Sequence, residues 1–233
     1  MLQTKAHVAI EKSSSYFLVG PFCRNKDYRG IFEFCEPEEL YLKNAIQYLK
    51  NEGLPVYFGK WQIDGKPNAI LVDFLSLVPK LNEIKYYFSE ATNGIRVPDE
   101  DFSANDSIMF GSGVGRFLDR VIEEKMLLEG RQSKSQNNST VNNVCTASCC
   151  AKSLDNSNRQ EATKEVESPK ALLMHCHEWI TGSAIIFCRR QAKNRDRIGT
   201  IFTTHATTLG RFLSSDNFNL YEGINSVIDL FIP

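Results

Sequence analysis

The chain lacks a sizeable net charge, a long apolar run and an apolar leader. Its 233 residues carry 27 Lys and Arg against 28 Asp and Glu, which leaves a formal net charge of −1. Domains that bind nucleic acid are usually basic, so the composition argues against a large nucleic-acid surface. No segment approaches the roughly 20 apolar residues that a membrane span needs, and residues 1–6 lack the apolar stretch of a signal peptide. We expect a cytoplasmic protein that contacts neither nucleic acid nor membrane.

The cysteine content does not suggest a disulfide framework, because the number of cysteines is odd at seven. Cys145 and Cys149 have a separation that suits zinc ligands, but a structural zinc site needs four ligands and no partner pair lies nearby. Free thiols are therefore favoured over zinc, and we expect no metal and no cofactor. Four other cysteines have apolar neighbours and are predicted to be small buried hydrophobes: Cys23, Cys35, Cys176 and Cys188.

Apolar runs bounded by turn signals predict the order of elements. Short apolar or alternating runs predict strands at residues 16–21, 31–35, 56–61, 68–74, 171–175 and 198–204. Helical spacing predicts helices at 37–53, 105–125 and 178–190, the first of them opened by Pro37. Strands that alternate with helices indicate an α/β fold, and we expect a mostly parallel sheet with helices on both faces.

Residues 130–169 differ in composition from the rest of the chain. They contain no aromatic residue and are dominated by Ser, Asn, Gln, Lys and Glu. Such a segment cannot bury enough apolar surface to offset the entropy of ordering, so we predict a disordered insertion. The expected organisation is one domain at residues 1–129 that continues at 170–233 after the insertion at 130–169.

Gly111, Gly113 and Gly115 form a glycine-rich stretch inside a predicted helix. A dinucleotide-binding loop would need a strand directly before it, so that phosphate meets a new helix N-terminus, and no strand is predicted there. Close helix packing is therefore the favoured use of these glycines.

His175, His177 and Glu178 follow one another at the end of a predicted strand. Residues two apart on a strand point the same way, so the two imidazoles could share a metal. The helical zinc motif spaces its histidines four apart, however, and no third ligand is evident. We favour a structural role, in which one His ends the strand and hydrogen-bonds the neighbouring loop while Trp179 and Ile180 pack the helix on the sheet.

A second strand end, in residues 200–211, places His205 and Arg211 around a turn. The carboxyl end of a strand is where open α/β sheets present side chains to ligands, and an imidazole with a guanidinium suits a phosphorylated or polyhydroxylated substrate. His205 could instead cap the turn among threonines, and Arg211 could lie on a solvated helix face or pair with Asp216.

The order of these motifs resembles the N-terminal part of eukaryotic glycogen synthase. The resemblance covers residues 2–126 and 170–221, and the motif at 201–207 with its extension at 209–211 is the most specific part. Five further motifs carry it, at residues 2–6, 16–21, 56–61, 104–106 and 177–179.

This resemblance implies a Rossmann-like domain, the N-terminal half of a GT-B glycosyltransferase in which two such domains face each other across a cleft. It implies transfer of glucose from UDP-glucose to the non-reducing end of an α-1,4-glucan, with retention and without a metal. His205 matches the family's active-site histidine, which contacts the donor glucose, and Arg211 matches the arginine that contacts the donor diphosphate. Glycogen, glycogenin and further copies of the enzyme are the partners that the resemblance implies.

The chain departs from the family pattern at both ends. A Gly-Gly loop that touches the donor lies upstream of the residue matching Leu2, the C-terminal nucleotide-binding domain is absent, and the likeness fades after Tyr221. We expect a fragment that is inactive alone. The alternatives are a truncated, catalytically incompetent product and an unrelated phosphate-binding α/β protein.

Overall fold

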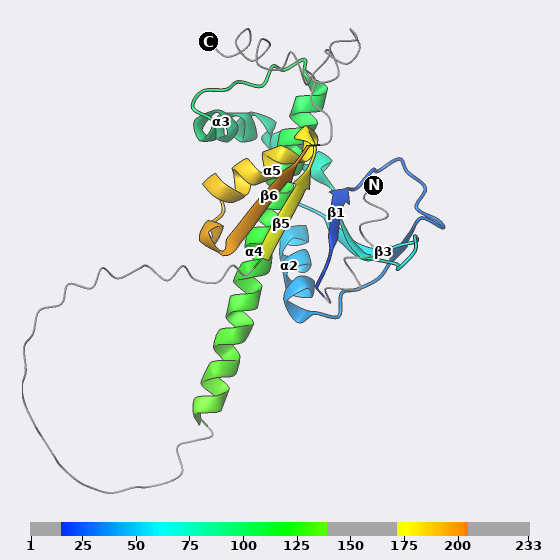
Figure 1. Ribbon diagram of the computed structural model, residues 1–233, viewed down its shortest axis with the longest axis vertical. Helices are drawn as coiled ribbons and strands as arrows, with labels where there is room; N and C mark the ends of the chain where they lie inside the picture. The colour runs from blue at the N-terminus through cyan, green and yellow to red at the C-terminus, as the bar shows by residue number, and fades with distance from the viewer. Residues whose placement is uncertain (1–14, 139–171, 205–233) are drawn as a thin grey trace, which may run out of the picture.

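A computed structural model describes residues 15–138 and 172–204. Their elements follow in the order β1 (Leu18–Pro21), β2 (Phe32–Phe34), α2 (Leu40–Asn51), β3 (Val56–Trp61), β4 (Asn68–Val72), the 3₁₀ helix η1 (Phe74–Lys80), α3 (Leu81–Ala91), α4 (Phe102–Asn138), β5 (Leu172–His177), α5 (Trp179–Arg190), the 3₁₀ helix η2 (Arg195–Arg197) and β6 (Ile198–Thr203). The predicted alternation of strands and helices is confirmed, and the chain is a mixed α/β protein (Figure 1).

The strands of the described residues form two sheets, with the orders β1-β4-β3-β2 and β5-β6. β1 pairs with β4 and β5 pairs with β6 in parallel, whereas β2–β3 and β3–β4 are antiparallel. The expectation of a mostly parallel sheet is therefore met only in part, since two of the four strand pairings of these residues are parallel. Only residues 62–67 join β3 to β4, and a parallel neighbour would need a crossover of a dozen residues or more.

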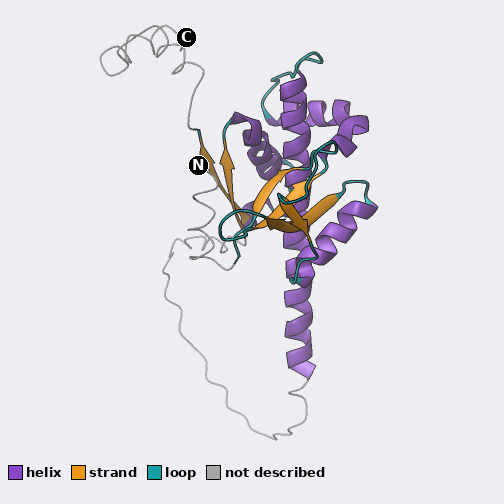
Figure 2. Cartoon of the chain, turned by 90° about the vertical axis from the view of Figure 1, so that its right-hand side faces the viewer, coloured by secondary structure: helices purple, strands orange, loops and turns teal. Residues whose placement is uncertain are grey.

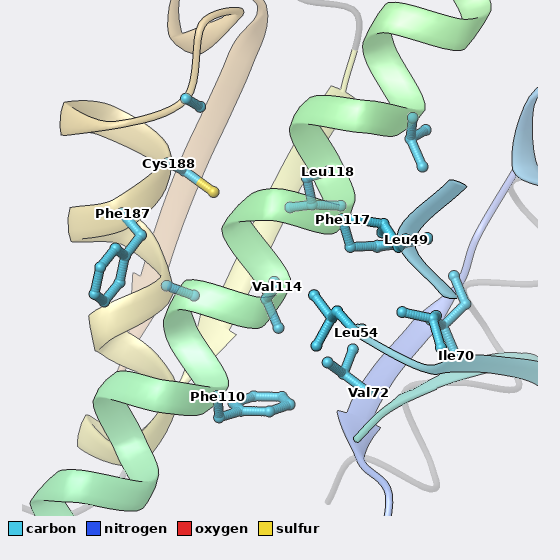
Figure 3. Packing of buried hydrophobic residues seen from close by; sticks show 14 of the residues in the cluster. Leu49, Leu54, Ile70, Val72, Phe110, Val114, Phe117, Leu118, Phe187 and Cys188 are labelled. Atoms are coloured by element: carbon cyan, nitrogen blue, oxygen red, sulfur yellow. The ribbon is translucent and has the colours of Figure 1, made fainter. Parts of the chain in front are cut away.

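The long helix α4 lies at the centre of the described structure and contributes to the core that both sheets share. It packs against α5, α2, α3 and η1 (Figure 2). Phe117 and Leu118 of α4 belong to one buried cluster with Ile70 of β4, Phe187 of α5 and Ile198 of β6. Figure 3 shows the side chains of α4 lying between α5 on one side and the β4 region on the other. The stripe predicted on this helix is buried throughout: Ile108, Met109, Phe117, Leu118, Val121 and Ile122.

The three glycines of α4 serve close packing, as predicted. A Cβ on Gly111 would lie 2.7 Å from the backbone nitrogen of Ala184, and one on Gly115 would lie 3.1 Å from Cβ of Phe187, both in α5. Gly113 faces the other way, where a Cβ would lie 3.0 Å from Val72 of β4. The absence of side chains at these positions lets the helix approach an element on each side.

Some boundaries and burials differ from prediction. The first helix begins at Leu40 rather than Pro37, and α4 runs on to Asn138, beyond the predicted end near residue 125. The prediction of a disordered insertion at 130–169 is therefore wrong for residues 130–138, which are helical, and residues 139–169 lie outside the described residues. Cys176 and Cys188 are buried as predicted, but Cys23 and Cys35 are exposed. Within the described ranges, no helix is both long and apolar enough to cross a membrane.

Candidate functional site

The carboxyl ends of β5 and β6 lie side by side and form the first part of the candidate site. The two strands pair in parallel, with His175 opposite Ile201 and His177 opposite Thr203. α5 begins two residues after β5 ends, so its N-terminus borders the same edge. Polar side chains from the ends of both strands thus gather where ligands bind in open α/β sheets.

The two histidines point to the same side of β5, as their spacing predicts. Their ring centroids lie 4.1 Å apart, and Nε2 of His175 lies 2.8 Å from the hydroxyl oxygen of Thr203. The hydrogen bond from His175 therefore reaches the neighbouring strand rather than the predicted loop. Across the part of the chain that the structure describes, no group of three or more His, Cys, Asp and Glu residues could hold a metal ion.

Cys176 lies between the two histidines and points to the opposite, buried face of β5. Burial raises the pKa of this thiol, and a hydrogen bond with Thr181 lowers it by less. The group is therefore a neutral thiol at pH 7 and not a reactive thiolate.

Glu178 forms the turn from β5 into α5 with φ of 66° and ψ of 163°. Few residues other than glycine adopt this conformation, and such backbone strain tends to gather at functional sites. The turn is held by the Glu178 N–H, which donates to the Thr203 carbonyl at 2.9 Å, and by the hydroxyl of Thr181, which donates to the His177 carbonyl at 2.7 Å. The Thr204 hydroxyl donates to the Glu178 carboxylate at 3.3 Å, which links this acid to the end of β6.

Trp179 and Ile180 do not pack the helix on the sheet, contrary to prediction. Their exposed fractions are 60% and 47%, and the buried face of α5 is formed by Ala184, Phe187 and Cys188. Trp179 lines a largely apolar hollow of about 430 Å³ together with Phe202 of β6. An aromatic side chain thus borders the polar strand ends, an arrangement that suits a ligand with both hydroxyl groups and an apolar ring face.

A further polar pair follows β1 and β4, and sequence reasoning missed it. Nε of Arg24 donates to both carboxylate oxygens of Asp73, at 3.0 and 3.1 Å, and Asp73 is 5% exposed. Because β1 and β4 are parallel, both residues lie at the carboxyl edge of their sheet. Figure 1 shows β1 and β5 running toward the same end of the molecule. The sequence feature that could have pointed to this pair is the acidic residue Asp73, which directly follows the strand-forming run 68–72.

The two residues that the sequence favours as ligand contacts, His205 and Arg211, lie outside the described residues. β6 ends at Thr203, so the described chain stops one residue before His205. Cys145 and Cys149, the zinc alternative, also lie outside the described residues. The site as described therefore consists of His175, His177, Glu178, Trp179, Thr203 and Thr204.

Comparison with known proteins gives one consistent family. The family model described as glycogen synthase matches residues 1–134 and 133–230. The chain is 30% identical to the liver glycogen [starch] synthase of Rattus norvegicus over 226 residues, which is 97% of this chain and 25% of the relative. It is 29% identical to glycogen [starch] synthase isoform 2 of Saccharomyces cerevisiae, over 97% of this chain and 27% of the relative. The chain thus spans about a quarter of the length of these relatives.

Proposed function

The chain belongs to the glycogen synthase family, and we propose that it forms part of an enzyme that transfers glucose from UDP-glucose to the non-reducing end of an α-1,4-glucan, with retention of configuration. The observation that carries this proposal is the family match along nearly the whole chain. Because the matched part is about a quarter of each relative, we propose that the 233 residues alone do not transfer glucose. We propose further that this enzyme binds glycogen and glycogenin, assembles with other copies of itself and is located in the cytoplasm.

The proposed fold is a Rossmann-like domain of the GT-B type, made of residues 1–129 and 170–233 with an insertion at 130–169. The parallel unit β5-α5-β6 supports it, since a strand, a helix and a parallel strand form the repeating unit of such domains. The polar residues at the carboxyl edge of this unit also fit, because that edge holds the ligand in open α/β sheets. The antiparallel β2-β3-β4 segment is a local departure from the pattern.

We assign the donor contacts to His205 and Arg211. When UDP leaves, negative charge develops on the phosphate oxygens, and a guanidinium can stabilise it with paired charge-assisted hydrogen bonds. An imidazole at the strand end can orient the sugar hydroxyls beside the reacting carbon. The position of Thr203 at the end of β6 supports this assignment, because His205 follows it by two residues.

The experiment replaces the matching segment of the yeast isoform 2 enzyme with this chain and measures transfer of labelled glucose from UDP-glucose to glycogen. We expect the chimera to be active and Arg211→Ala to lower kcat by about 10²-fold or more, with a similar loss for His205→Ala. Arg96→Ala is the control, because Arg96 is exposed and lies outside the proposed site. Activity like that of the parent chimera in both site variants would overturn the residue assignment. Transfer of glucose by the isolated chain would contradict the proposal that the 233 residues alone are inactive.

A further inference from the structure

A second hollow, of about 440 Å³, lies away from the carboxyl ends of β5 and β6, between η1, α3, α4 and the end of α5. Its walls carry Lys80, Arg116 and Arg190, each from a different element. Arg190 is the last residue of α5, whereas Trp179 at the candidate site is the first. At about 1.5 Å per residue the two ends of α5 lie roughly 17 Å apart, so this hollow is separate from the candidate site.

The three cations of this hollow have no acidic partner among the described residues. Some other basic side chains of the described chain are paired, among them Arg24 with Asp73, Lys85 with Asp99, and Arg120 with Glu123 and Glu124. No ion pair or side-chain hydrogen bond between described residues involves Lys80, Arg116 or Arg190. Glu83 is the one acid of the lining, so the hollow carries an excess of positive charge. Like charges that line one hollow repel one another, and an anion bound between them would offset this repulsion.

A hydroxyl in the wall adds a neutral donor to this charge. Ser112 of α4 lines the hollow, and its hydroxyl oxygen is accessible from it although the residue as a whole is only 7% exposed. No hydrogen bond between described residues involves this hydroxyl, so it is available to a ligand oxygen. The surface of the hollow thus offers one hydroxyl donor beside the ammonium and guanidinium groups.

The rest of the lining suits the body of a small organic molecule. Leu77 and Ile84 are buried apolar residues of the wall, and Tyr87 presents a ring that is 45% exposed. A volume of about 440 Å³ is far larger than a phosphate group and lies in the usual range for small-ligand sites. The positive charge of the hollow favours an oxyanion. The apolar wall and the tyrosine ring can contact the organic part of a ligand that carries this oxyanion.

We propose that this hollow binds the phosphate group of a small phosphorylated ligand, held by Lys80, Arg116 and Arg190 with the Ser112 hydroxyl. Guanidinium groups bind phosphate oxygens through paired, charge-assisted hydrogen bonds, and the lysine adds a further charge. Glu83 limits the affinity by repelling the phosphate. Tyr87 contacts the organic part and distinguishes a phosphorylated sugar or nucleotide from free phosphate.

The test is calorimetric titration of the full chain at low salt with inorganic phosphate, ribose 5-phosphate and adenosine monophosphate, and with glucose as the uncharged control. We expect saturable binding of the three phosphates and none of glucose. Arg116→Ala and Arg190→Ala each weaken binding by about tenfold or more, which is the scale of one charged hydrogen bond. Glu83→Gln tightens binding, and Tyr87→Ala weakens the two organic phosphates while leaving inorganic phosphate unchanged.

Arg96→Ala is the matched control, because it removes the same charge from an exposed residue outside the hollow. Unchanged affinity in this variant supports a defined site. An equal loss of affinity in Arg96→Ala and Arg116→Ala would reveal general charge attraction and overturn the proposal, as would the absence of saturable binding. Circular dichroism confirms that each variant is folded, and since both arginines are exposed, their removal leaves the core intact.

Discussion

At the scale of single residues, Glu178 has a backbone conformation that residues other than glycine rarely adopt. Its φ of 66° and ψ of 163° cost of the order of 1–3 kcal/mol, and the conformation persists because the turn is hydrogen-bonded on both sides. The side chain is linked to Thr204 at the end of β6. This chain thus has an acid at a backbone position that favours glycine, next to the polar strand ends of the candidate site.

Replacing Glu178 with glycine and with alanine separates strain from the loss of the carboxylate. Both variants lose the contact to Thr204, but only glycine relieves the strain, so we expect Glu178→Gly to be more stable than Glu178→Ala by about 1 kcal/mol. Urea unfolding measures the difference. The same pair of changes at exposed Glu100, whose φ is not positive, serves as the control, with alanine equal to or better than glycine. Equal stability of the two Glu178 variants would show that the turn is unstrained.

The cysteines show that apolar neighbours in the sequence predict the burial of a side chain at some positions and not at others. Cys188 is fully buried against α4, and burial raises the pKa of its thiol to about 12, which agrees with the predicted role of a small hydrophobe. Cys35 has apolar neighbours as well but follows β2, the outer strand of its sheet, and is exposed. Neighbouring side chains on a strand face opposite ways, and one face of an outer strand can remain open to water.

At the scale of elements, the contact of α4 with α5 depends on small residues. Gly111 meets the Ser183 side chain and the Ala184 backbone, and the Ser183 hydroxyl donates to the Ser107 carbonyl at 2.6 Å. The Ser107 hydroxyl in turn donates to the Ile180 carbonyl at 2.9 Å. The two helices are thus joined by hydrogen bonds at the point where their backbones come closest.

Gly111→Ala is expected to destabilise the protein by about 1–3 kcal/mol, because the new methyl group meets backbone atoms that cannot move aside. Gly130→Ala, in the same helix, is the matched control. A Cβ at Gly130 meets nothing within 4 Å, so the better helix propensity of alanine should stabilise by up to about 1 kcal/mol. Thermal unfolding followed by circular dichroism measures both. A stabilising Gly111→Ala would mean that α4 and α5 are farther apart than described.

At the scale of the whole molecule, the two sheets share one core through α4. The buried cluster includes Ile70 of the four-stranded sheet and Ile198 of the two-stranded sheet, with Phe117 of α4 fully buried in it. Figure 3 shows Phe117 and Leu118 on the stretch of α4 that lies between the layers. Loss of packing at this stretch should therefore affect both sheets together.

Phe117→Ala is expected to lower the free energy of unfolding by about 3–5 kcal/mol, since it leaves a large cavity in the shared core. Hydrogen exchange should show amides of β4 and β6 losing protection together. Phe102→Ala is the control on the same helix, because this ring is 78% exposed and its removal should change stability by no more than about 0.5 kcal/mol. Retained protection in β5 and β6 after loss of β4 would show two independent units.

The sequence by itself determined the order of strands and helices, the buried stripe of α4 and the common direction of His175 and His177, because periodicity and spacing are local properties. It also determined the family, since the motifs are contiguous. Tertiary structure decided the pairing directions of β2, β3 and β4, the exposure of Trp179, the Arg24–Asp73 pair and the meeting of Lys80, Arg116 and Arg190. Each of these depends on which distant elements pack together, and such contacts are set by the shape of the whole core rather than by any one segment.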